Sequence, residues 1–108
     1  MGDDPSLLIE KAHDLMSRGE FSAAVSVFQE AIKHPDLGGS DKSQVYNNIG
    51  LCYLKLGDSD EAHTYFSVAL RFDSKNFFAF YNKGLLHETA GELESAIEDY
   101  DHAIDVQP

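Results

Sequence analysis

Two stretches decide the fold: YNNIGLCYLKLGDSDEAHTYFSVAL at residues 46–70 and FYNKGLLHETAGELESAIEDYDHAI at residues 80–104. Their alanines Ala62 and Ala96 lie 34 residues apart, and the surrounding residues repeat in step. In both stretches one glycine lies five residues before the alanine, another lies twelve before it, and an aromatic residue follows four later. A fixed period of this length is typical of a stack of similar supersecondary units.

Each unit is predicted to form a helix, a tight turn and a second helix. Apolar and small residues recur three or four apart on both sides of Gly57, as they do in amphipathic helices. Gly57 is expected to end a helix that runs from about residue 43 to 56, because glycine readily takes the left-handed conformation at a helix end. Asp58 or Ser59 is then expected to cap the second helix. Gly91 has the same place in the next unit.

Small residues have a steric role in this pattern. Gly50 and Gly84 are expected where the two helices of a hairpin approach closely, and a larger side chain there would separate the axes beyond the usual ~8–10 Å. Phe80 is expected in the core. A weaker copy of the pattern surrounds Ala24, and Ala24 and Ala62 are 38 residues apart.

Four extra residues therefore separate the first two units. We expect them in an insertion loop at about residues 35–42, where the sequence is rich in turn-forming residues. A longer second helix in the first unit is the alternative.

The two stretches resemble the tetratricopeptide repeat (TPR) family. The resemblance covers about residues 5–108 as a single domain of three repeats, at about 5–38, 43–76 and 77–108. It implies an all-α fold in which three stacked antiparallel helix hairpins, with six helices, form a right-handed TPR superhelix. It also implies a concave groove, lined by the first helix of each repeat, that binds a peptide or helix of a partner protein.

The repeat register predicts which first-helix residues face that groove. Asn48 and Asn82 are the strongest candidates, because an amide both donates and accepts hydrogen bonds to a peptide backbone. The alternative for these amides is a bond to a neighbouring helix or to solvent, and the alternative for Phe78 and Tyr81 is packing against the preceding repeat. The full set is Ile9, Glu10, His13, Gln44, Asn47, Asn48, Leu51, Lys55, Phe78, Tyr81, Asn82 and Leu85.

One known TPR function, the carboxylate clamp that holds chaperone tails, is not expected. In the family this clamp consists of lysine, asparagine and arginine side chains. The matching positions here are Ile9, His13, Asn48, Phe78 and Asn82, and only Asn48 keeps the clamp residue. Without the basic groups, an acidic tail would form no charge-assisted bonds.

Composition limits the partners and the compartment. The net charge is −11, from 19 acidic and 8 basic residues, which opposes binding to nucleic acid or to an anionic membrane. A protein partner with basic or apolar character is expected instead. Six acids between Glu92 and Asp105 are expected on a solvated helix face, with a docking strip for a basic partner as the alternative. One cysteine, Cys52, excludes an internal disulfide and favours a reducing, cytoplasmic location.

The sequence offers no catalytic or metal-binding pattern. Its five histidines are scattered, and no metal-ligand, phosphate-loop or nucleophile motif occurs. Cys52 is expected to be a buried, inert thiol, and His87 to pack within its hairpin. No cofactor, no metal and no enzymatic activity are expected.

The chain is thus predicted to be a non-catalytic interaction scaffold, with assembly as the alternative. TPR arrays usually carry a further helix over the last repeat, and none follows here, so Ile97, Tyr100 and Ile104 are expected to be partly bare. Such a surface suits a homodimer, a longer TPR array or a larger parent protein. The start of the chain formally matches a myristoylation motif at Gly2, but Asp4 with Pro5 is expected to begin a helix instead.

Overall fold

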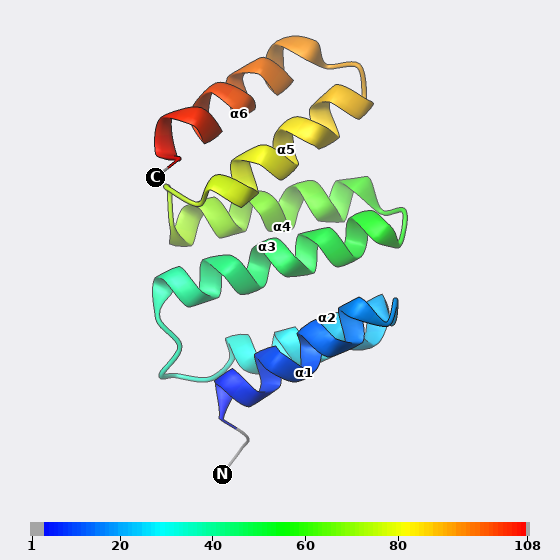
Figure 1. Ribbon diagram of the computed structural model, residues 1–108, viewed down its shortest axis with the longest axis vertical. Coiled ribbons are helices and arrows are strands. Elements are labelled where there is room, and N and C mark those ends of the chain that lie inside the picture. The colour runs from blue at the N-terminus through cyan, green and yellow to red at the C-terminus, as the bar shows by residue number, and fades with distance from the viewer. Residues whose placement is uncertain (1–3, 108) are drawn as a thin grey trace.

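The computed structural model describes residues 4–107, which form six α-helices and no strands. The helices pair into three antiparallel hairpins that stack along the long axis of the molecule (Figure 1). None of these six helices is long and apolar enough to cross a membrane. The helices are α1 (Pro5–Ser17), α2 (Phe21–Ile32), α3 (Gly39–Lys55), α4 (Ser59–Phe72), α5 (Phe77–Thr89) and α6 (Leu93–Val106).

Glycine ends the first helix of every hairpin, as the sequence predicts. Gly19, Gly57 and Gly91 have φ angles of 78°, 84° and 81°. This left-handed conformation strains residues that carry a Cβ atom. At the middle turn the Asp58 amide donates to the Tyr53 carbonyl at 2.9 Å, which closes the last turn of α3.

Side chains cap three of the helix starts. The Asp4 carboxylate accepts the Ser6 amide at 2.8 Å, so the predicted start of α1 is confirmed, while Gly2 lies outside the described residues. Asp58 caps α4 by accepting the Glu61 amide at 3.1 Å. Such caps satisfy amides that have no partner within the helix.

The four extra residues between the first two hairpins lengthen α3 at its start. The insertion loop expected at about residues 35–42 is therefore wrong in its extent. Helix α3 already begins at Gly39, so the connection covers only residues 33–38. The alternative of a longer α2 is also wrong, because α2 ends at Ile32 and is two residues shorter than α4. Gly38 and Gly39 resemble loop residues in sequence, but Gly38 serves as the N-cap of α3.

Aromatic rings occupy the space that the two helical glycines leave. A Cβ atom on Gly50 would lie 2.5 Å from Cε1 of Phe66, and one on Gly84 would lie 2.6 Å from Cε1 of Tyr100. Phe66 is completely buried, so its ring has little room to move. The expected close approach of the two helices is confirmed in both hairpins.

Two expectations about single core residues have different outcomes. Cys52 is completely buried, as expected, and burial raises the pKa of its thiol to about 11. Phe80 is only half-buried, so its placement in the core was wrong. Its ring stacks on that of His102 of α6, with 5.1 Å between the centroids.

A buried polar chain fastens the third hairpin to the second. The Ser43 hydroxyl donates to the Ala69 carbonyl at 2.6 Å, which joins α3 to α4. The Asn76 amide donates to the same hydroxyl at 2.8 Å, and its oxygen caps α5 by accepting the Ala79 amide. This chain fixes where α5 begins relative to the second hairpin.

The glycine–aromatic contact can be tested by adding a side chain. We expect Gly50→Val to lower the free energy of unfolding by about 2–3 kcal/mol, because overpacking a filled core displaces its neighbours. The matched control Gly38→Val should cost only about 1 kcal/mol, since its backbone is extended and an added Cβ atom meets no atom within 4 Å, so the cost is that of a poor N-cap residue alone. Urea unfolding of both variants provides the comparison, and equal losses would contradict the close-contact account.

Candidate functional site

The first helices of the three hairpins are connected by side chains from the predicted groove set. The Asn48 amide nitrogen lies 3.0 Å from Nε2 of His13, which links α3 to α1. The Asn82 amide donates to the Asn47 oxygen at 2.9 Å, which links α5 to α3. The structure therefore brings four of the predicted residues into contact across α1, α3 and α5.

The two strongest candidates, Asn48 and Asn82, have different surroundings. Asn82 is only 7% exposed and Asn47 only 6%, and their amides bind each other. For Asn82 the structure thus shows the alternative noted above, a bond to a neighbouring helix. Asn48 is half-buried and its partner His13 is exposed, so this pair remains open to a ligand.

Two aromatic side chains of α5 are open to solvent. Phe78 is 63% exposed and Tyr81 43%, and the ring of Phe77 packs against both. The alternative that Phe78 packs against the preceding repeat does not hold at this exposure. Tyr81 approaches Tyr100 of its own hairpin, with 5.9 Å between ring centroids. The remaining predicted residues are half-buried at Ile9, Leu51 and Leu85, and exposed at Glu10, Gln44 and Lys55.

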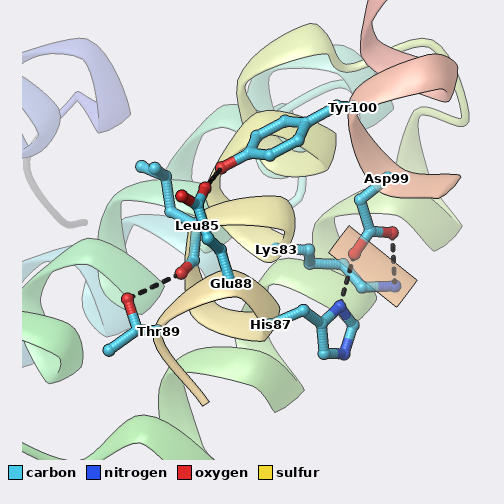
Figure 2. Close-up of polar contacts among 7 residues, drawn as sticks. All are labelled: Lys83, Leu85, His87, Glu88, Thr89, Asp99 and Tyr100. Carbon is cyan, nitrogen blue, oxygen red and sulfur yellow. Dashed lines mark hydrogen bonds and ion pairs between the residues drawn. The ribbon is translucent and has the colours of Figure 1, made fainter. Parts of the chain in front are cut away.

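The predicted apolar surface on α6 is only partly as expected. Ile97 and Ile104 are 59% and 65% exposed, and Leu93, which the sequence analysis missed, is 60% exposed. Tyr100 faces inward instead, against Gly84. Its hydroxyl donates to the Glu88 carboxylate at 2.7 Å (Figure 2), and this bond raises the pKa of Tyr100 to about 12.

A buried carboxylate joins α5 and α6. Asp99 is 7% exposed, with Nδ1 of His87 at 2.5 Å and Nζ of Lys83 at 4.0 Å (Figure 2). Asp99 is therefore not on the solvated acidic face where it was expected. His87 does pack within its hairpin, through a polar contact. Asp99 follows Ala96 by three residues, and this helical spacing could have placed it on the inner face.

The described residues contain no group of three or more His, Cys, Asp and Glu side chains with metal-binding geometry. Nor does any buried side-chain nitrogen or oxygen among residues 4–107 lack a hydrogen-bond partner. The polar groups that the structure buries are thus accounted for by contacts within the protein.

Two tetratricopeptide repeat models match the sequence, at residues 9–77 and 79–108. The chain belongs to the tetratricopeptide repeat family. The TPR hairpins therefore account for nearly all of the sequence.

Curated relatives of this TPR domain are much longer proteins. FK506-binding protein 59 of Drosophila melanogaster is 36% identical over 67 residues, which is 62% of this chain and 15% of the relative. Sperm-associated antigen 1 of Rattus norvegicus is 30% identical over 101 residues, which is 94% of this chain and 11% of the relative. The chain thus spans less than a fifth of either relative.

Solved structures confirm the fold. The second TPR of Spaghetti (RPAP3), bound to the HSP90 peptide SRMEEVD, superposes with a TM-score of 0.82 at 17% identity, covering 95% of this chain and 92% of that one. The Yersinia enterocolitica secretion chaperone SycD, in complex with a peptide of the translocator YopD, gives 0.86 at 20% identity, covering 99% and 79%.

The buried amide pair predicts unequal effects of two similar substitutions. Asn82→Ala leaves the Asn47 amide buried without its partner, and we expect it to lower the free energy of unfolding by about 1–3 kcal/mol. After Asn48→Ala the exposed partner His13 can bind water instead, and we expect a loss below about 1 kcal/mol. Chemical unfolding of the two variants measures both, and an equal cost would contradict the structural role of Asn82.

Proposed function

We propose that this TPR domain is a non-catalytic scaffold that binds an extended peptide or a helix of a partner protein along α1, α3 and α5. The observation that carries the proposal is that Phe78 and Tyr81 of α5 are exposed. Exposed aromatic side chains are frequent anchors of protein interfaces, because they bury a large apolar area at small entropic cost.

Other features of the chain also support a protein partner in this groove. Asn48 and His13 offer donor and acceptor groups, and half-buried Leu51 and Leu85 supply apolar contact. RPAP3 and SycD, which share the fold, were both solved with a partner's peptide. The net charge of −11 favours a basic or apolar partner over nucleic acid or membrane. A lone buried thiol at Cys52 suits a reducing, cytoplasmic location.

We further propose that the partner is not the acidic tail of a chaperone. Apolar side chains, Ile9 and Phe78, stand where the clamp of that TPR class has lysines, and Asn82 stands where it has arginine. The Asn82 amide is also bound to Asn47. A carboxylate at this surface would meet a strongly acidic protein without a cluster of cations to stabilise it.

Assembly through α6 is the second candidate function. Leu93, Ile97 and Ile104 place exposed apolar side chains on the outer helix of the last hairpin. Exposed apolar side chains at this helical spacing favour contact with another helix, from a second copy or from a longer array. This surface lies on a different helix from the proposed groove, so variants can separate the two functions.

The groove is tested with peptides selected against the protein from a displayed random library. We expect Phe78→Ala with Tyr81→Ala to weaken the selected peptides at least about tenfold, the range seen for interface anchors. The control Ile97→Ala with Ile104→Ala should bind them unchanged. Isothermal calorimetry measures the affinities. Loss of binding only in the α6 variant, together with a change of mass in light scattering, would contradict the groove and favour assembly.

The chaperone-tail exclusion has its own test, with the heptapeptide SRMEEVD as the probe. We expect no saturable heat when up to millimolar peptide is titrated into the protein at physiological salt. The second TPR of RPAP3 serves as the positive control, because it has been solved with this peptide. A micromolar dissociation constant for the chain described here would overturn the exclusion.

A further inference from the structure

A cleft of about 510 Å³ lies between the second and third hairpins, near their turns. Its lining comes from the end of α3, the start of α4, the second half of α5 and the residue before α6. The cleft shares Leu85 with the proposed groove but consists mainly of other residues.

The apolar part of the lining could hold an aliphatic chain. Leu54 of α3, Leu85 and Leu86 of α5, and Ala90 directly after α5 contribute this surface. Thr89 adds no free donor, because its hydroxyl already donates to the Leu85 carbonyl at 2.8 Å (Figure 2). A straight side chain with several methylene groups fits such a surface, provided that its polar end reaches the carboxylates of the cleft.

The charged part of the lining is purely acidic. Asp60 comes from α4 and Glu92 precedes α6, so the two carboxylates belong to different repeats. No lysine or arginine lines the cleft. The start of α4 carries a partial positive charge from its backbone, but Asp60 and Glu61 in its first turn oppose that charge. A cationic group is thus favoured between the carboxylates.

The two histidines of the cleft present aromatic rings to a guest. His63 and His87 lie edge to face, with 5.3 Å between their centroids. Nδ1 of His87 is engaged by Asp99, whereas His63 is half-buried at the cleft. Burial, followed by the charge of Lys83 and the proximity of His87, lowers the pKa of His63. A lowered pKa favours the neutral imidazole, which does not repel a cation.

We propose that this cleft binds an arginine side chain of a basic partner protein. The guanidinium lies between Asp60 and Glu92, its plane stacks on the imidazole of His63, and its methylene groups cover the leucines. Arginine suits the site better than lysine, because a planar guanidinium donates to two carboxylates and stacks on an aromatic ring at the same time. The proposal does not depend on peptide binding along α1, α3 and α5.

Three blocked pentapeptides test the proposal: acetyl-Gly-Ser-Xaa-Ser-Gly-amide with arginine, lysine or citrulline as the central residue. Citrulline keeps the shape of arginine and removes its charge. Each peptide is titrated into ¹⁵N-labelled protein at 150 mM salt, and the amide shifts of Ser59, Asp60, His63 and Ala90 are followed by NMR. We expect saturable shifts in the cleft with arginine, about tenfold weaker binding with citrulline, and weaker binding with lysine.

Charge-matched variants give the second part of the test. Asp60→Asn with Glu92→Gln should abolish the arginine-dependent shifts. Asp101→Asn with Glu98→Gln removes the same charge from exposed positions of α6 outside the cleft, and should leave the shifts unchanged. Equal binding of arginine and citrulline, equal binding of arginine and lysine, or shifts spread over the whole acidic surface would overturn the proposal. If the cleft variant does not fold, the comparison of the arginine, lysine and citrulline peptides on the unaltered protein tests the proposal by itself.

Discussion

The contact between a helical glycine and an aromatic ring is the constraint on which the rest of this TPR structure depends. Phe66 fills the space beside Gly50, and Tyr100 fills the space beside Gly84. Each contact sets how closely the two helices of a hairpin approach. In both hairpins the glycine faces the second helix, and other sides of α3 and α5 make contacts between hairpins, such as the bond between Asn82 and Asn47. The surface proposed to bind a partner is thus a consequence of hairpin packing.

Much of the fold could be predicted because it depends on local and periodic features. The glycines that end α1, α3 and α5 take left-handed conformations that few other residues tolerate, and Asp4 and Asp58 cap helices at the expected places. The length of α3 could not be predicted in the same way. Gly38 and Gly39 resemble a loop, but the start of α3 lies against the end of α4, where Gly39 approaches the Phe72 carbonyl oxygen and Lys42 lies over the Phe72 ring.

The contacts between repeats were the part of the candidate site that could not be predicted from the sequence. The repeat register showed that Asn47, Asn48 and Asn82 lie on first helices, but not which amides meet across two hairpins. That pairing depends on the offset between successive hairpins, which buries Asn82 against Asn47 and leaves Asn48 with exposed His13. In the same way, the position of Asp99 beside His87 depends on how α6 turns toward α5. The exposed aromatics need a similar distinction at the start of α5, where Asn76 and Ala79 are buried while Phe78 is 63% exposed.

A double-mutant cycle between Gly50 and Phe66 tests the central constraint most directly. Gly50→Val, Phe66→Leu and the double variant are unfolded in urea, and the coupling free energy is calculated from the four proteins. The account predicts a coupling of at least about 1 kcal/mol, with Phe66→Leu costing less when valine already crowds the ring. Additive losses would contradict the account, because they would show that the glycine and the ring act independently.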